Sequence, residues 1–264
     1  MKNAILIADY ANDSLTVQEL RSTLLGHLNG RAPASISFVS SSPNTINSSY
    51  LLKQILITEE HWGDPNNLVL FVSADARTNL NTASPFLLMK HRSGAWVCGP
   101  NAGYSFSMIR TEIAYLYKYP NLHEGAQLRS RDLYMRLMAL LMMEQDDTME
   151  LEDLHQDAIP ALTGFYVGHI DSFGTIKTTI PHSFMKGKHV IGSSVSVTVG
   201  DTTTKAFYTD NLFGFQPGAL VIAPGSSGSP DDPLLEIGVW EHLPLLGARK
   251  YFQHAAVGLK VQLV

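Results

Sequence analysis

Two aspartates stand where apolar, strand-like runs of the sequence break off. Asp9 follows the run at residues 4–8, and Asp171 follows the alternating run from Gly164 to Ile170 and precedes a Phe-Gly turn and a second strand. A carboxylate at the end of a strand can accept hydrogen bonds from a ligand, and open α/β sheets bind ligands at that edge. On position alone, an Asp that caps a turn or a helix is the commoner case. Both residues are therefore candidates for ligand binding.

Other candidate residues have ordinary structural explanations as well. The run Gly99 to Gly103 is a turn signal, and Ser130 can cap the helix that begins near it. Asp75 and Arg77 suit a surface loop with a local ion pair, and Tyr208 suits a core or rim position. Each of these residues gains a functional interpretation only from its place among the other motifs.

The composition is that of an ordinary globular protein, with 264 residues, 45% apolar and 16% charged. A net charge of −5 without a Lys/Arg run argues against nucleic acid or an anionic membrane as the main partner, so we expect a small-molecule ligand. The single cysteine, Cys98, cannot form an internal disulfide, which suits a cytoplasmic protein, and no Cys/His cluster has the spacing of a structural zinc site. We expect no metal or other cofactor. The apolar run at Leu137 to Met143 is shorter than the ~20 residues that span a bilayer, which favours a core helix.

The periodicity predicts two domains, an α/β domain at residues 1–155 and a smaller all-β, barrel-like domain at residues 161–264. Residues 155–160 are interpreted as the connection between them. In the first domain, strands alternate with helices, which predicts a mostly parallel sheet. The expected strands lie at 4–8, 35–40 and 68–72, and the expected helices at 14–28, 50–57, 104–113 and 131–143.

The order of four motifs resembles the family of S-adenosylmethionine hydroxide adenosyltransferases and fluorinases/chlorinases. The Ile-Asp, Phe-Gly, strand pattern resembles the opening of that family's C-terminal domain. A second match is the Gly-Pro-Asn-x-Gly turn at 99–103. A third is the segment at 128–133, which stands in place of the family's Phe-His-Gly-Arg-Asp or Phe-Tyr-Ser-Arg-Glu. The fourth is a Ser-Ser-Gly turn at 225–228, followed by Leu-Glu-Ile within 235–239. The resemblance extends from Asp9 to Val239, with an insertion at 229–234.

This resemblance implies a role for each matching residue. Asp9 would bind the ribose hydroxyls, Asp171 the amino group of the methionine portion, and Ser226 and Ser227 the amino-acid end of the ligand. Ser130 would lie near the reacting carbon. Three substrate-binding candidates remain. Tyr208 stands at the position of an aromatic residue that stacks on adenine, and Thr175 stands in place of an Asn that binds adenine. Asn101 belongs to the Gly-Pro-Asn-x-Gly turn.

Two departures from the family bear on the reaction. Hydrolytic members carry Asp-Pro-Gly-Val-Gly-Thr and a following Arg after the third strand, where this chain has the run from Ser73 to Asn79. Arg129 replaces the His of the Phe-His-Gly-Arg-Asp motif. Asp75 is then the only nearby acidic residue that could act as a base for water, with Arg77 beside it. Asp75, Arg77, Arg129 and Ser130 are the candidate catalytic residues.

The resemblance therefore implies an enzyme that displaces methionine from the ribose 5′ carbon of S-adenosylmethionine, as a homotrimer. Because the leaving group is a neutral thioether, the reaction needs an aligned nucleophile but no general acid. Water, giving adenosine, is the default nucleophile, and halide or another anion stays open. A non-catalytic S-adenosylmethionine- or adenosine-binding homologue is the alternative. An unrelated α/β hydrolase is disfavoured, because the only Ser-centred turn, at 225–228, lies in the β-rich part.

Overall fold

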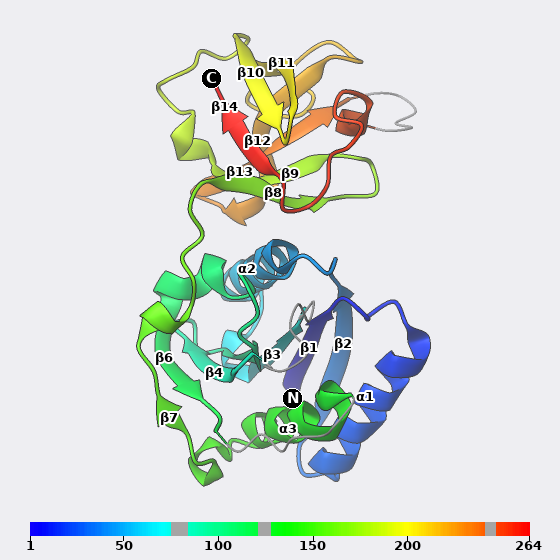
Figure 1. The fold of residues 1–264 in the computed structure, drawn as a ribbon, viewed down its shortest axis with the longest axis vertical. Helices are drawn as coiled ribbons and strands as arrows, with labels where there is room; N and C mark the ends of the chain where they lie inside the picture. The colour runs from blue at the N-terminus through cyan, green and yellow to red at the C-terminus, as the bar shows by residue number, and fades with distance from the viewer. Residues whose placement is uncertain (75–83, 121–127, 241–246) are drawn as a thin grey trace. The chain divides into compact units, whose positions relative to one another are not determined.

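The computed structural model describes residues 1–74, 84–120, 128–240 and 247–264. The chain forms two compact units, Met1–Leu162 and Thr163–Val264, which we call the N-terminal unit and the barrel unit (Figure 1). An α/β part is thus followed by an all-β part, as the sequence predicts. Asp75 and Arg77 lie outside the described residues.

The N-terminal unit contains a seven-stranded mixed sheet of order β2-β1-β3-β5-β4-β6-β7. The pairs among β2, β1, β3 and β5 are parallel, and those of β5 with β4, β4 with β6 and β6 with β7 are antiparallel. The sheet is therefore only partly parallel, because β4 returns to β5 through a tight turn, which requires no crossover helix. The strands are β1 (Lys2–Ala8), β2 (Ala34–Ser40), β3 (Leu68–Ser73), β4 (Phe86–His91), β5 (Trp96–Pro100), β6 (Ile113–Lys118) and β7 (Glu152–Asp153).

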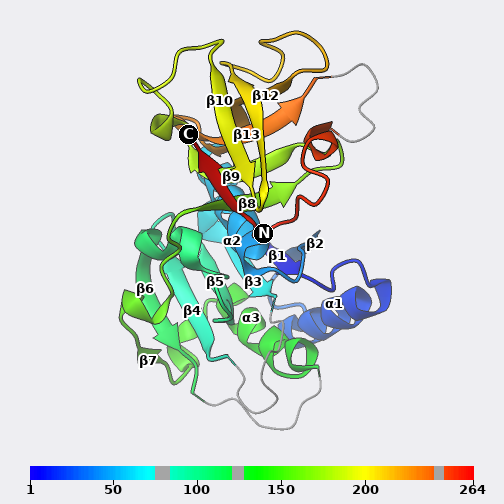
Figure 2. The ribbon, with the colours of Figure 1, turned by 45° about the horizontal axis from the view of Figure 1, so that its top comes forward.

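Helices cover both faces of this sheet, as Figure 1 and Figure 2 both show. α1 (Ser14–Leu28) and α3 (Met135–Met142) pack with Leu6 and Phe71 on one face, and α2 (Thr45–Trp62) packs with Ile7 and Val72 on the other. Successive side chains of a strand point to opposite faces, so neighbouring apolar residues supply two separate cores. Because the apolar runs of β1 and β3 are continuous, helices must cover both faces of these strands.

The helix predicted at 104–113 is wrong. This segment forms turns and a 3₁₀ helix, Ser107–Glu112, which leads into β6. The hydroxyl of Thr45 accepts a hydrogen bond from the backbone N–H of Tyr104, and the hydroxyl of Ser49 accepts one from Met108 (2.9 and 3.0 Å). Because side chains of α2 satisfy these N–H groups, the segment has less need of helical bonds of its own.

The segment at 155–160, interpreted from the sequence as a connection, packs onto the N-terminal unit. The side chain of Gln156 donates to the carbonyl of Ile113 (2.9 Å), Ser107 donates to the carbonyl of Pro160 (2.6 Å), and Ile159 is buried. The boundary between the compact units accordingly falls after Leu162.

The barrel unit is a closed barrel of order β10-β11-β12-β13-β9-β8-β14. Alternate residues point inward, as in β10, where Val195, Val197 and Val199 are buried. The barrel has one continuous apolar core. Its strands are β8 (Phe165–Ile170), β9 (Ile176–Pro181), β10 (Ser194–Val199), β11 (Thr202–Tyr208), β12 (Leu220–Ser229), β13 (Asp232–Val239) and β14 (Lys260–Leu263).

Candidate functional site

A pocket of about 160 Å³ lies at the carboxyl edge of the parallel strands in the N-terminal unit. Asp9 directly follows β1, Ser73 ends β3, and Pro100 ends β5. Ser130 and Arg129, from much later in the sequence, also line the pocket. The structure therefore brings together Asp9, Arg129 and Ser130, three residues that the sequence proposes for ligand binding or catalysis, at the edge where open α/β sheets bind ligands.

The segment that carries Ser130 has an uncommon local structure. Residues Ser130–Tyr134 form one π-helical turn before α3, and such turns are frequent at functional sites. The ring of Tyr134 stacks on that of Phe86, with centroids 4.4 Å apart, and so holds this turn against the sheet. The buried Ser130 hydroxyl is thereby placed 3.4 Å from that of Ser73.

Tyr10 adds a third hydroxyl to the same place. Its hydroxyl is buried beside those of Ser73 and Ser130, and it makes no hydrogen bond of good geometry to a described residue. Burial raises the pKa of the Tyr10 phenol, and the nearby Ser130 and Ser73 hydroxyls partly offset this effect. The phenol therefore stays protonated at neutral pH and can donate to a ligand atom. We call Tyr10, Ser73 and Ser130 the hydroxyl cluster.

Neither Tyr10 nor Ser73 is among the residues singled out from the sequence. Both adjoin positions that the sequence does indicate, since Tyr10 follows Asp9 and Ser73 directly follows the third predicted strand, 68–72. The strand-end rule that selects Asp9 could have found Ser73 as well.

The predicted turn at Gly99 to Gly103 has a structural role beside the pocket. Gly99 has φ +152°, and a Cβ atom there would collide with the carbonyl oxygen of Val72, so glycine lets β5 lie close to β3. Asn101 does not line the pocket. Its side-chain amide donates instead to the carbonyl of Ala158 (2.8 Å), which ties the 155–160 segment to this turn.

In the barrel unit, Asp171 caps its own turn. Its carboxylate accepts hydrogen bonds from the backbone N–H groups of Phe173 and Thr175, both at 3.0 Å. This is the structural alternative that the sequence leaves open for an Asp at a strand end. Thr175 is buried within the same hairpin. The ligand contact expected for Asp171 stays a prediction.

Ser226 is exposed and contacts an ion pair whose two side chains are largely buried. The Lys177 ammonium lies 2.7 Å from the Glu236 carboxylate and donates to the Ser226 hydroxyl (3.0 Å), and the Ser226 N–H donates to Glu236 (3.0 Å). Burial, together with the Lys177 charge, lowers the pKa of the nearby His169. Because the Lys177 ammonium is paired with a carboxylate, it is not available as a free base to activate the Ser226 hydroxyl.

Tyr208 and Ser227 are both buried in the barrel unit. Tyr208 belongs to the apolar core, with 4% of its surface exposed, and its hydroxyl is 2.7 Å from Nε2 of His182. A base stacks on an aromatic ring only where a face of the ring is free. The placement of Tyr208 therefore favours the core interpretation over adenine stacking.

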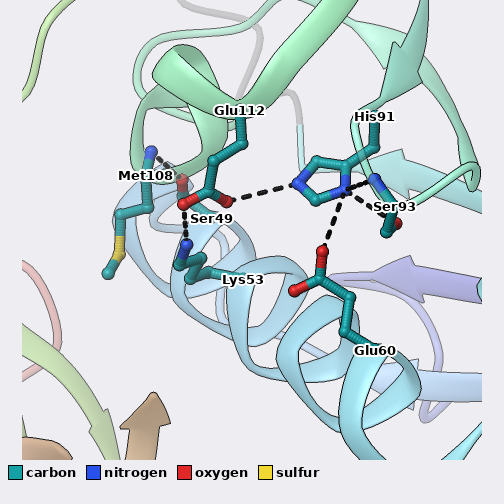
Figure 3. A network of polar contacts seen from close by, with 7 residues as sticks. All are labelled: Ser49, Lys53, Glu60, His91, Ser93, Met108 and Glu112. Atoms are coloured by element: carbon teal, nitrogen blue, oxygen red, sulfur yellow. Dashed lines mark hydrogen bonds and ion pairs between the residues drawn. The ribbon is translucent and has the colours of Figure 1, made fainter. Parts of the chain in front are cut away.

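A second polar cluster in the N-terminal unit joins α2 to β4 (Figure 3). The Glu112 carboxylate accepts hydrogen bonds from Lys53 and from Nε2 of the buried His91 (3.2 Å). Nδ1 of His91 accepts the N–H of Ser93 (3.2 Å), so the proton of the neutral ring lies on Nε2. Glu60 approaches Nδ1 at 3.9 Å. Lys53 balances the charge of Glu112, and the hydrogen bonds of this cluster join α2 to β4.

Acid is expected to weaken this cluster. Burial by itself raises the pKa of Glu112, but hydrogen bonds from His91 and Lys53 outweigh burial and lower it below the ordinary 4.5. A lowered folded-state pKa means stability that is present above pH 4.5 and is lost as the pH falls below it. We expect Glu112→Gln to flatten the pH dependence of unfolding below pH 4.5 and to lower stability at pH 7.

Tryptophan fluorescence in a Trp240→Phe background, which leaves Trp62 and Trp96 in the N-terminal unit, would follow this unfolding. Glu152→Gln, which removes an exposed ion pair with Lys118, is the control. An unchanged acid slope in Glu112→Gln would contradict the assignment.

Within the described part of the chain, no group of three or more His, Cys, Asp or Glu side chains is placed to hold a metal ion. Over the same residues, no helix is long and apolar enough to cross a membrane.

Comparisons with known proteins relate this fold to two solved structures. A protein from Thermotoga maritima, described as an uncharacterized conserved protein, has a TM-score of 0.78 at 20% identity, over 99% of this chain and 100% of its own. A conserved hypothetical protein from Thermus thermophilus has a TM-score of 0.66 at 17% identity, over the full length of both chains. No family model and no curated protein matches the sequence. This chain is similar to both structures in its whole two-unit fold.

Proposed function

We propose that this protein binds S-adenosylmethionine and displaces methionine from the ribose 5′ carbon. The proposal rests on the pocket at the carboxyl edge of β1 and β3, which is lined by Asp9, Arg129 and the hydroxyl cluster. The motif order that resembles the S-adenosylmethionine hydroxide adenosyltransferase and fluorinase/chlorinase family supports the choice of ligand. A volume of about 160 Å³ is below the ~300 Å³ of a typical small-molecule site. The pocket therefore suits the ribose and the nucleophile rather than the whole ligand.

In this proposal, Asp9 accepts hydrogen bonds from the ribose hydroxyls and so fixes the sugar. The hydroxyl cluster holds the nucleophile, which attacks the 5′ carbon as the carbon–sulfur bond breaks and its electron pair leaves with methionine. The protein's contribution is alignment and exclusion of water. Arg129 adds a positive charge, which disfavours a sulfonium nearby unless an anion binds as well. The more specific form of the proposal therefore has an anion as the nucleophile.

A product screen tests the reaction directly. The protein is incubated with S-adenosylmethionine in water alone, with halides and with small carboxylates, and the products are identified by mass spectrometry. Adenosine indicates water as the nucleophile, and a 5′-substituted adenosine indicates the anion. We expect Ser73→Ala and Ser130→Ala each to slow product formation about tenfold or more, because each removes a hydrogen-bond donor to the nucleophile. Unchanged rates in both variants would exclude the hydroxyl cluster from the reaction.

The second candidate is a homologue that binds S-adenosylmethionine or adenosine without reaction. The residues described around the pocket include no histidine, and Asp9 is their only carboxylate, so a base for water is not evident among them. Measurable binding with intact S-adenosylmethionine under every condition would favour this candidate. The homotrimer implied by the resemblance is part of the proposal, and light scattering measures it.

A further inference from the structure

A second cavity, of about 370 Å³, opens at the opposite edge of the sheet in the N-terminal unit. Lys2 begins β1, Trp96 begins β5, and Asn66 lies just before β3. Asp9 and Pro100 lie at the other ends of these parallel strands, and none of the residues described around one cavity lines the other. The second cavity is therefore separate from the proposed S-adenosylmethionine pocket.

One wall of this cavity is formed by an ion pair between Lys2 and Glu144, whose opposite charges balance each other. The Lys2 ammonium lies 2.7 Å from the Glu144 carboxylate and also donates to the backbone carbonyl of Asn66 (3.3 Å). Glu144 follows α3 with φ +57°, a left-handed conformation usually occupied by glycine. The charges of Lys2 and Glu144 are thus satisfied within the protein, and neither requires a ligand.

The other two charged side chains described around the cavity, Lys90 and Asp146, have no such ion pair to a described residue. Lys90 is half-buried, with its ammonium 4.9 Å from the centre of the Trp96 ring. Burial lowers the pKa of Lys90, and attraction to Asp146 partly offsets this effect. Among the residues that the structure describes, Lys90 and Asp146 form no ion pair with each other or with any third residue. The cavity therefore offers one ammonium and one carboxylate.

Aromatic rings supply the apolar surface between these charges. Tyr115 and Tyr117 are two residues apart on β6 and point to the same face of the sheet, and both line the cavity with Trp96. Tyr115 is 62% exposed, so its ring surface is open to a ligand. A group with an apolar body can pack on these rings.

We propose that this cavity binds a free α-amino acid with an apolar side chain. The ligand carboxylate pairs with Lys90, the ligand ammonium pairs with Asp146, and the side chain packs on Tyr115. Two lysines and two carboxylates are the charged residues described around the cavity, and their formal charges sum to zero. A zwitterion matches that balance, whereas a phosphate dianion would be repelled by Glu144 and Asp146. The volume of about 370 Å³ lies within the ~300–1,000 Å³ range of small-molecule pockets.

Calorimetry with three related probes tests this site. L-phenylalanine carries both charges, 3-phenylpropionate lacks the ammonium, and 2-phenylethylamine lacks the carboxylate. We expect L-phenylalanine to bind most tightly, and Lys90→Met and Asp146→Asn each to weaken it about tenfold or more. Lys118→Met and Asp147→Asn are matched controls outside the cavity, and both are expected to bind like the unmodified protein.

Three results would overturn the proposal. They are an absence of heat from L-phenylalanine at millimolar concentration, equal binding of 3-phenylpropionate and L-phenylalanine, and unchanged affinity in Asp146→Asn. If Lys90→Met does not fold, Lys90→Gln takes its place, and Lys90→Arg is expected to retain binding because it keeps the charge. Asp9→Ala is expected to bind L-phenylalanine normally, so failure of the proposed S-adenosylmethionine site would leave this test intact.

Discussion

Replacing Asp9 with alanine is expected to lower the affinity for adenosine and for S-adenosylmethionine about tenfold to a hundredfold. Asp9 is the only carboxylate among the residues described around the pocket, and the loss of one charge-assisted hydrogen bond costs roughly 1.5–3 kcal/mol. Isothermal titration calorimetry at a fixed salt concentration measures the change. Asp9→Asn, which keeps the size but loses the charge, is expected to give a smaller loss.

Asp147→Ala is the matched control, since Asp147 is exposed and lies outside the pocket. Circular dichroism of each variant separates a lost contact from a lost fold. Adenosine affinity in Asp9→Ala equal to that of the unmodified protein would refute the assignment of Asp9 to the ribose.

The largest expected effect on stability comes from the ion pair between Lys177 and Glu236 in the barrel unit. Their side chains are only 15% and 12% exposed. Lys177→Met leaves the Glu236 carboxylate buried without its cation, which is expected to cost about 3 kcal/mol. The double variant Lys177→Met/Glu236→Leu removes both charges and is expected to recover much of this loss, because two apolar side chains need no partner.

Hydrogen exchange in peptides from β12 and β13 is the suitable measurement, since it reports on the barrel strands themselves in a chain with two compact units. Lys205→Met, which changes an exposed lysine of β11, is the control. If Lys177→Met exchanges like this control, the ion pair does not stabilise the barrel.

The two edges of the N-terminal sheet offer different chemistry to a ligand. The carboxyl edge of the parallel strands presents Asp9 and the hydroxyl cluster, which suit neutral hydroxyls and a small nucleophile. The amino-terminal edge presents Lys90 and Asp146 between aromatic rings, which suit a zwitterion. Because the two sets of side chains do not overlap, substitutions at one edge can be tested without altering the lining of the other.

Local sequence patterns determined the elements whose burial follows a simple period. The apolar run of β1 and the apolar stretch of α3 each reveal a buried face without knowledge of the partner. The leucine spacing of α1 predicts the helix but not its buried face, since Leu15 and Leu25 are exposed. The change to short alternating strands after Gly164 marks the barrel for the same reason. Asp9 could be chosen from the sequence because a strand ends there, and strand ends place side chains at a sheet edge.

Tertiary structure alone decided the features that depend on distant partners. The segment after Gly103 forms turns and a 3₁₀ helix instead of an α-helix, and Thr45 and Ser49 of α2 satisfy two of its backbone N–H groups. The Asn101 side chain donates to the carbonyl of Ala158, 57 residues away in the sequence, and does not line the pocket. The hydroxyl cluster exists only because Ser130 is brought to Ser73, also 57 residues apart. Such contacts carry no signal at short sequence separation, since each side chain forms an ordinary local pattern until the fold supplies its neighbour.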